Sequence, residues 1–143
     1  MVLFWRAAKR VARCFKRHKL FDKSGVWIGD ASYVFVPDNK KYEKSVRLLF
    51  DEHGHPIDSA RLAKMSPEAA ARCQWRRCYK LVSLLYVDPS RNFFLRAAMR
   101  LVPGNEHECP ILYDMVDKFV EDVGDAVIKR LLLDRGFIDG ERI

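Results

Sequence analysis

Apolar residues recur at helical spacing along the first part of the chain. The apolar stripe consists of Phe4, Ala8, Val11 and Phe15. Basic residues form a second stripe, and together the two stripes predict a basic amphipathic helix from Val2 to about Lys19. Residues 26–36 are rich in β-branched and aromatic residues and apolar at both odd and even positions. This pattern predicts a central strand covered on both faces.

The middle of the chain gives clear signals only in part. Residues 38–65 are mixed, and their pattern does not decide between strand, turn and loop. A serine followed by a proline and an acidic first turn then predicts a helix over residues 67–77. Two apolar runs at 79–87 and 93–102, joined by a short turn-rich connector, predict a hairpin, although helix propensity competes in the second run.

The last third of the chain has the pattern of a helix followed by a short strand. Pro110 suits the first turn of a helix that ends at Gly124 as a left-handed C-cap. The apolar run 131–133 then predicts a buried strand that ends at Asp134. The resulting order of elements predicts an α/β fold with a mixed sheet and a right-handed crossover. In such a sheet the first and last strands can be parallel neighbours.

The charge of the chain is concentrated at its beginning. The 143 residues, 49% of them apolar, suffice for one hydrophobic core. Residues 1–20 hold seven basic and no acidic side chains and so account for the net charge of +7. A basic segment on a neutral body is typical of polyanion-binding modules, and equally of a solvated helix face. We therefore separate residues 1–24, a basic helix and linker, from the main domain.

Membrane attachment and zinc binding have little support in the sequence. No stretch approaches the roughly 20 apolar residues that span a bilayer, so we expect a soluble, cytoplasmic protein without a membrane partner. The four cysteines favour reduced thiols. Structural zinc remains an alternative, although the spacing of its potential ligands is loose. These ligands are His53, His55, Cys73, Cys78, His107 and Cys109.

Asp30 and Asp134 carry the strongest chemical signal. Each is flanked by apolar residues on a predicted buried strand, where an unpaired carboxylate would be costly. If the two strands are neighbours, the pair can bind hard divalent cations and promote an in-line phosphoryl displacement. Spacing alone favours an alternative equally, in which Asp30 caps a turn and Asp134 pairs with Arg135.

Several segments resemble DDE-type insertion-sequence transposases, whose catalytic domain has a ribonuclease-H-like fold. The family's strand with the first catalytic aspartate resembles VWIGDASYVFVPD. The second strand, the turn before the first core helix and the strand of the second aspartate resemble, in the family's order, YKLVSLL, LVPGNEHE and LLLDRGFIDG. The last segment is the most specific, because an apolar strand ending in Asp-Arg-Gly-Phe or Asp-Arg-Gly-Tyr is a hallmark of these enzymes.

The resemblance implies a DNA transposase that cleaves and transfers strands at transposon ends in double-stranded DNA. It makes Asp30 and Asp134 catalytic ligands of Mg²⁺ or Mn²⁺ in a two-metal site. Their domain, over residues 25–143, would be a partial ribonuclease-H-like module with an insertion at 38–78. The family's third carboxylate is a glutamate on a later helix, and Glu141 is too close to Asp134 to replace it. We therefore expect a truncated, inactive fragment of a nucleoid-associated protein that forms a homo-oligomer at full length.

Further residues are predicted to contact DNA. Arg135 follows the second aspartate, and Lys80 is placed like a family lysine beside the sheet. The basic helix contributes Arg6, Arg10, Arg13 and Arg17. The alternative function is a non-catalytic basic module of the same fold for nucleic-acid binding or assembly. Trp75, within a cluster of arginines, is most simply a core residue, and base stacking is its alternative.

Overall fold

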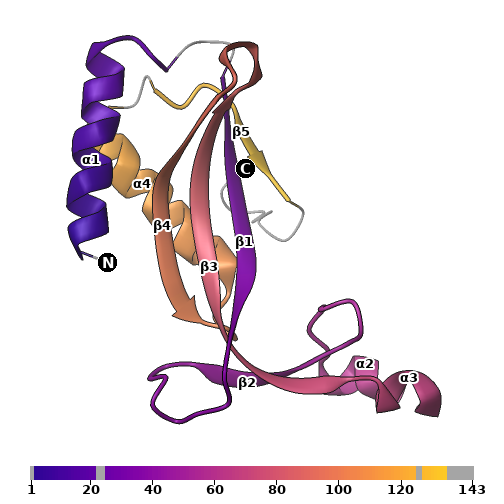
Figure 1. Ribbon diagram of the computed structural model, residues 1–143. Coiled ribbons are helices and arrows are strands. Elements are labelled where there is room, and N and C mark those ends of the chain that lie inside the picture. The colour runs from indigo at the N-terminus through magenta and orange to yellow at the C-terminus, as the bar shows by residue number, and fades with distance from the viewer. Residues whose placement is uncertain (1, 22–24, 125–126, 135–143) are drawn as a thin grey trace. The chain divides into compact units, whose positions relative to one another are not determined.

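The structure is a computed structural model that describes residues 2–21, 25–124 and 127–134. Its helices are α1 (Val2–Arg17), α2 (Ser59–Ala63), α3 (Pro67–Ala71), the 3₁₀ helix η1 (Pro89–Arg91) and α4 (Glu108–Val123). Its strands are β1 (Val26–Val36), β2 (Val46–Phe50), β3 (Gln74–Asp88), β4 (Phe93–Pro103) and β5 (Leu131–Leu133), as Figure 1 shows. Within the described ranges, no helix has the length and apolar character needed to cross a membrane.

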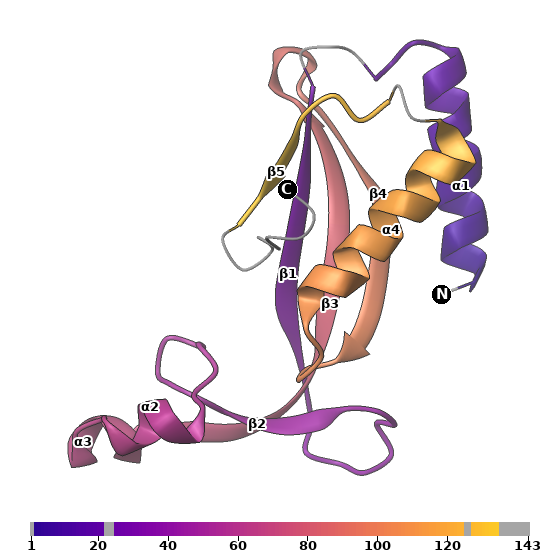
Figure 2. The same cartoon turned by 180° about the vertical axis from the view of Figure 1, so that it is seen from behind.

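The five strands form one mixed sheet in the order β2-β3-β1-β5, with β4 paired to β3. Strands β1 and β5 run parallel, and their register joins Trp27 to Leu131 and Gly29 to Leu133. Figure 2 shows β5 beside β1. Strands β2 and β3 are antiparallel. These observations confirm the predicted mixed α/β sheet and the parallel pairing of the first and last strands.

The chain divides into two compact units. The first unit comprises Met1–Ser32, Leu81–Arg100 and His107–Ile143, and the second comprises Tyr33–Lys80 and Leu101–Glu106. Strands β1, β3 and β4 each contribute residues to both units. The predicted excursion at residues 38–78 falls within the second unit, and the basic helix α1 belongs to the first.

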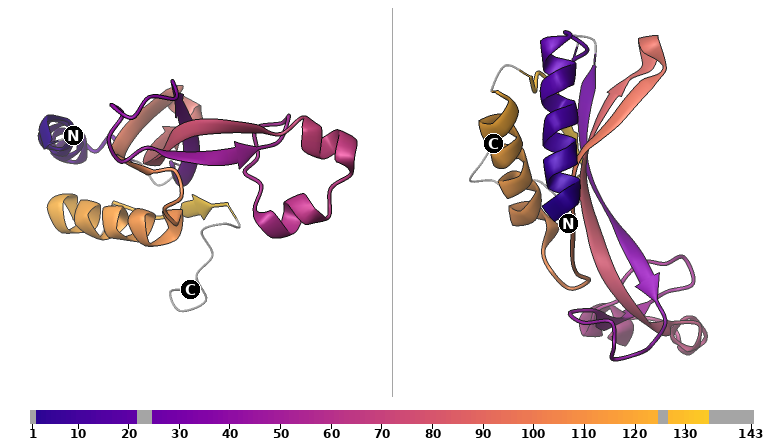
Figure 3. Two further views of the ribbon diagram at one scale, coloured as in Figure 1. Left: turned by 90° about the horizontal axis from the view of Figure 1, so that it is seen from below. Right: turned by 60° about the vertical axis from the view of Figure 1, so that its left-hand side comes forward.

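The core of the first unit lies between α4 and the sheet. Helix α4 buries one stripe, Cys109, Leu112, Met115, Phe119 and Val123. The ring of Phe119 lies 4.8 Å from that of Trp27 on β1, measured between centroids. Helix α1 lies beside α4 (Figure 3). Ala12 is fully buried and Val11 is 39% exposed, so the prediction that Val11 belongs to the apolar stripe was wrong.

Polar contacts explain why the face of α1 that carries Ala12, and not the face of Val11, turns toward α4. Lys9 and Arg13 share the helical face of Ala12, and both contact Asp122 at the end of α4. The Lys9 ammonium lies 2.6 Å from the Asp122 carboxylate, and Arg13 Nε donates to the Asp122 carbonyl at 3.0 Å. Lys16 donates to the Val123 carbonyl at 2.6 Å. Cations at a helix C-terminus satisfy its free carbonyls and complement its dipole, so this face turns toward α4.

Strands β3 and β4 form the predicted hairpin, and the helical alternative for residues 93–102 was wrong. Asn92 closes the connector in the left-handed region, with φ 48°. The fully buried Asp88 accepts from Ser90 Oγ at 2.6 Å and pairs with Arg91 Nε at 2.8 Å. The hydrogen bond from Ser90, helped by Arg91, lowers the pKa of Asp88 below its ordinary value. The connector therefore holds its buried carboxylate in the charged form.

Two predicted helix boundaries and the predicted conformation of one helix cap were wrong. Helix α3 ends at Ala71 instead of residue 77, because the chain from Gln74 joins the ladder with β2. Helix α4 begins before Pro110, at Glu108, because the His107 imidazole accepts from the backbone N–H of Cys109 and caps the helix there. Gly124 is the C-cap of α4 with a positive φ of 123°, but its ψ of 151° lies outside the left-handed helical region.

Candidate functional site

The β1–β5 ladder brings the two predicted aspartates to neighbouring positions. The register pairs Trp27 with Leu131, Ile28 with Leu132 and Gly29 with Leu133. Continued by one residue, it sets Asp30 beside Asp134. Residues in register on adjacent parallel strands project from the same face, and such strands lie about 4.8 Å apart. That separation is comparable with the about 3.5–4 Å between the ions of a two-metal site.

The two aspartates lie on the open face of this part of the sheet. Trp27 is 1% exposed and packs on α4, and since side chains alternate along a strand, Asp30 projects from the opposite face. Asp30 and Asp134 are both exposed, and Leu132 is 57% exposed. The prediction that both faces of these strands are covered was therefore wrong within the described chain, because α1 and α4 pack in the first unit against the face of Trp27. The two carboxylates consequently retain access to water and ions.

Gly29 allows α4 to pack closely beneath Asp30. A Cβ atom on Gly29 would lie 2.5 Å from Leu112 Cδ2 on α4 and 2.6 Å from Leu133 Cδ2 on β5. A residue without a side chain therefore lets one leucine from each neighbour approach the backbone. The Gly29-Asp30 dipeptide combines close packing on one face with a carboxylate on the other.

The turn-capping alternative for Asp30 was wrong, because the residue lies inside β1. The other half of that alternative, a pair between Asp134 and Arg135, involves a residue outside the described ranges, as does the predicted DNA contact of Arg135. A carboxylate that does cap a helix lies in the second unit. Asp58 accepts from the Arg61 N–H at the start of α2.

The chemistry of the pair suits a hard cation. Asp30 and Asp134 offer carboxylate oxygens, the ligand type that Mg²⁺ and Mn²⁺ prefer. Their like charges also repel one another until a cation neutralises them. Within the described residues, no three His, Cys, Asp or Glu side chains come together as a metal-ligand group. The potential zinc ligands named above all fall in that part of the chain. Cys78 among them is buried, and burial raises the pKa of its thiol.

Lys80 is part of the packing of the second unit. It is 7% exposed, and its ammonium donates to the Glu106 carbonyl at 2.7 Å. The same ammonium lies 5.4 Å from the centroid of the Tyr33 ring. Its predicted DNA contact stays a prediction, and phosphate binding would require the ammonium to leave both partners.

The four predicted arginines of α1 form one stripe at helical spacing, and all four are exposed. Arg6, Arg10 and Arg17 make no side-chain hydrogen bond or ion pair with another described residue. Arg13 differs from them, because it donates to the C-terminus of α4. Neighbouring Lys9 and Lys16 are engaged there as well. The basic residues of α1 therefore divide into a row that holds α4 and a row that faces solvent.

Carboxylates with lowered pKa values in this structure are explained by fold contacts. Asp114 on α4 pairs with Arg100 on β4 at 2.8 Å, and the hydrogen bond from Arg100 is the main cause of its lowered pKa. The backbone N–H of His55 is the main cause of the lowered pKa of Asp51, which closes a turn. Perturbed pKa values often mark functional sites. Here they mark structural pairs.

Sequence reasoning placed Trp75 within a cluster of arginines but assigned it to the core, with base stacking as the alternative. Trp27 and Phe50 are buried, whereas Trp75 is 61% exposed, so its assignment to the core was wrong. Strand β3 extends back to Gln74, and its first three residues, Gln74, Trp75 and Arg76, are all exposed. The segment had instead been assigned to a helix.

Comparison with known proteins identifies no relative of this chain. No protein-family model, curated protein or solved structure matches the chain.

Proposed function

We propose that this chain carries the first two catalytic carboxylates of a DDE-type transposase catalytic domain with a ribonuclease-H-like fold, which performs metal-dependent phosphoryl transfer on DNA. The observation that carries the proposal is the parallel β1–β5 ladder, which pairs Gly29 with Leu133, the residues directly before Asp30 and Asp134. The two aspartates are 104 positions apart in sequence. Independently, they are the residues that the resemblance assigns to the first two catalytic positions.

In this proposal Asp30 and Asp134 hold Mg²⁺ or Mn²⁺. The bound ions would activate the attacking oxygen and stabilise the leaving oxygen of the phosphodiester. The residues themselves supply negative charge at an open sheet face, where an extended polyanion can reach the ions. The third carboxylate expected from the resemblance would complete the ligand set of the active enzyme.

A calorimetric titration with Mn²⁺ tests the proposed site. We expect binding heat for the wild-type chain and at least about a tenfold loss of affinity in Asp30→Asn and Asp134→Asn. Loss of a direct ligand should exceed the effect of changing an outer-shell partner, which already costs about 10–100-fold. The isosteric change removes the charge and keeps the shape of the side chain, so the fold should persist.

Asp58→Asn is the matched control. Asp58 is another exposed aspartate, and asparagine caps a helix as well as aspartate does, so this variant should bind Mn²⁺ like the wild type. Equal binding heats for the wild type and Asp30→Asn would remove metal chemistry from the proposal. An equal loss in all three variants would reflect nonspecific attraction of cations to acidic residues.

The exposed row on α1 favours a second candidate function, a basic module that binds double-stranded DNA without catalysis. Arg6, Arg10 and Arg17 project into solvent, whereas the other row of basic residues is occupied by α4. Guanidinium groups without carboxylate partners can neutralise phosphates and release counterions. Such binding would not depend on Asp30 or Asp134.

The salt dependence of duplex binding tests this second candidate. We expect the triple change of Arg6, Arg10 and Arg17 to Gln to reduce the slope of log K against log salt by up to about 2.7, since each phosphate contact contributes about 0.9. The control is the triple change of Lys40, Lys64 and Lys129 to Gln, three exposed lysines with the same total charge. If the control lowers the slope equally, net charge explains the binding and the candidate fails.

A further inference from the structure

The β2–β3 ribbon of the second unit presents arginines and an exposed tryptophan on one face. Its register pairs Arg47 with Arg77 and Leu49 with Trp75, and residues paired across an antiparallel ladder share a face. Arg47, Arg77 and Trp75 therefore project together. The Trp75 side chain is 61% exposed, and the Arg47 guanidinium carbon lies 6.0 Å from the centroid of its ring.

The charges on this face do not balance. Arg47 Nε lies 3.2 Å from one Asp38 carboxylate oxygen, and Arg77 Nε lies 3.0 Å from the other. Two guanidinium groups thus share one carboxylate. The Arg47 side chain is 50% exposed, so an incoming anion can reach it without disturbing the more buried Arg77. One positive charge remains beside the exposed indole.

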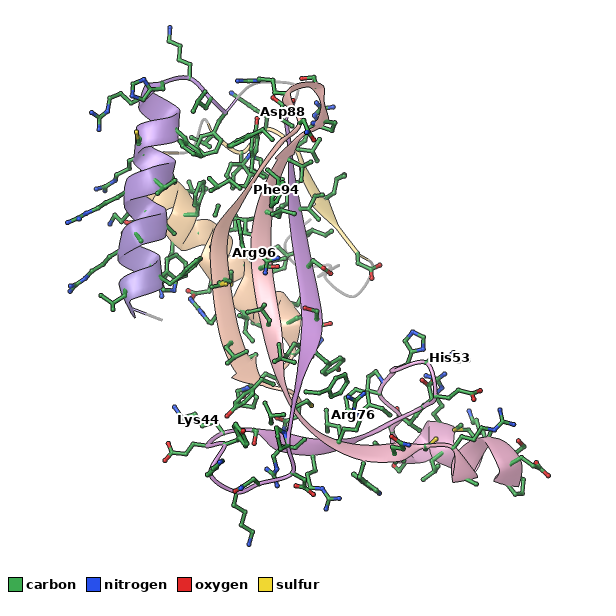
Figure 4. The ribbon with its side chains drawn as sticks, viewed as in Figure 1. Lys44, His53, Arg76, Asp88, Phe94 and Arg96 are labelled. Carbon is green, nitrogen blue, oxygen red and sulfur yellow. The ribbon has the colours of Figure 1, made fainter. Side chains whose placement is uncertain are left out.

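Arg76 lies on the opposite face of the ribbon, because its ladder partner is Leu48 and successive side chains of a strand alternate between faces. Its guanidinium carbon lies 3.4 Å from the centroid of the Phe35 ring, which fixes the side chain by a cation–π contact. No described carboxylate pairs with Arg76, which is itself exposed; Figure 4 labels it on β3. Phe35, Trp75 and Arg76 line one shallow hollow, together with Val36, Pro37, Asp38 and Arg77.

We infer that this surface, formed by Arg47, Arg77 and Trp75, binds single-stranded nucleic acid. An unpaired base would stack on the Trp75 indole, and a flanking phosphate would contact the Arg47 guanidinium group. Exposed aromatic rings beside cations are how proteins hold single strands without reading their sequence. Bases inside a duplex are already stacked on their neighbours, so the same indole has no base face to bind there.

The surroundings of Trp75 favour a nucleic acid over a protein partner. Hot-spot tryptophans of protein interfaces sit in apolar patches that exclude water. The Arg47 guanidinium lies over the Trp75 ring, and Leu49 is the neighbour of Trp75 across the ladder. On β2 and β3 no other large apolar side chain of the described chain is highly exposed. The inference goes beyond the proposed function and uses neither Asp30 nor Asp134.

Fluorescence anisotropy of a labelled oligothymidylate tests the inference, with the full chain in EDTA so that metal binding plays no part. The probe has about 12 nucleotides, within the ~4–16 covered by single-strand sites. We expect Trp75→Ala to weaken binding about 5- to 150-fold and Trp75→Phe to retain most of it, because phenylalanine can still stack. Arg47→Gln should lower the slope of log K against log salt by about 0.7.

Two control variants distinguish a specific binding site from nonspecific binding of the oligonucleotide. Phe94→Ala removes another exposed aromatic side chain, 72% exposed on β4, and Lys64→Gln removes another exposed cation of the second unit. Both should bind like the wild type. The inference is overturned if Trp75→Ala binds normally, if Phe94→Ala weakens binding equally, or if the oligonucleotide does not bind while Trp75→Ala abolishes self-association. The last result would make the surface a protein interface.

Discussion

Trp27→Ala should lower the free energy of unfolding by about 3–5 kcal/mol, the usual cost of truncating a buried tryptophan to alanine. Trp27 is 1% exposed, and its ring lies 5.3 Å from Phe21, 5.1 Å from Tyr86 and 4.8 Å from Phe119, measured between centroids. Its indole N–H donates to the Val127 carbonyl at 3.3 Å. Truncation therefore leaves a cavity and an unsatisfied carbonyl between β1 and α4. Since the free energy of unfolding of a domain is only about 5–15 kcal/mol, this variant would lose a large part of its stability.

Urea unfolding followed by circular dichroism measures this effect without relying on tryptophan emission. Trp75→Ala is the matched control, because it removes the same side chain from a position that is 61% exposed. Its free energy of unfolding should stay within about 0.5 kcal/mol of the wild type. Similar losses in the two variants would contradict the assignment of Trp27 as the centre of the first unit's core.

Leu112→Ala and Gly29→Ala should each destabilise the protein, and the double variant should cost less than the sum of the two. Leu112 is fully buried, so its truncation should cost about 2–5 kcal/mol. Gly29→Ala should cost about 1–3 kcal/mol by overpacking, because the new Cβ would lie 2.5 Å from Leu112 Cδ2. The φ of Gly29 lies outside the left-handed region, so backbone strain adds nothing.

The double variant is the informative one. When Leu112 is already alanine, the methyl group at residue 29 enters part of the space that the leucine left. Residues in contact typically show interaction energies of about 0.5–3 kcal/mol, and here the sign should be favourable. Denaturant unfolding of all four proteins gives the cycle. Leu132→Ala, at a position 57% exposed on β5, is the control and should be close to neutral. Strict additivity would mean that α4 does not pack beneath Asp30 as described.

Local patterns in the sequence were sufficient for most of the elements. The run of β-branched and aromatic residues at 26–36 predicted β1 with its bounds, and the basic amphipathic pattern predicted α1 to within a few residues. Ser66 caps α3 with its hydroxyl, as the Ser-Pro start predicted. These features depend on side chains within one or two turns of each other, so they can be inferred without the rest of the chain.

Elements that depend on distant partners could not be inferred in this way. Residues 74–77 have the propensity of a helix, but their ladder with β2 makes them part of β3. Strand β2 itself gave no pattern, because its burial comes from the second unit's tertiary packing. Tertiary contacts routinely override propensities that amount to a fraction of a kcal/mol per residue.

The same distinction between local pattern and distant partners applies to the candidate site. The sequence by itself determined which carboxylates to consider, because Asp30 and Asp134 interrupt apolar strands and lie in the segments on which the proposed resemblance rests. Only the tertiary structure decided the register of β5 on β1, which pairs the residues directly before the two aspartates, and that their face is open. A strand's own residues fix its period, but its partner fixes the register, and the packing of α1 and α4 fixes which face is covered.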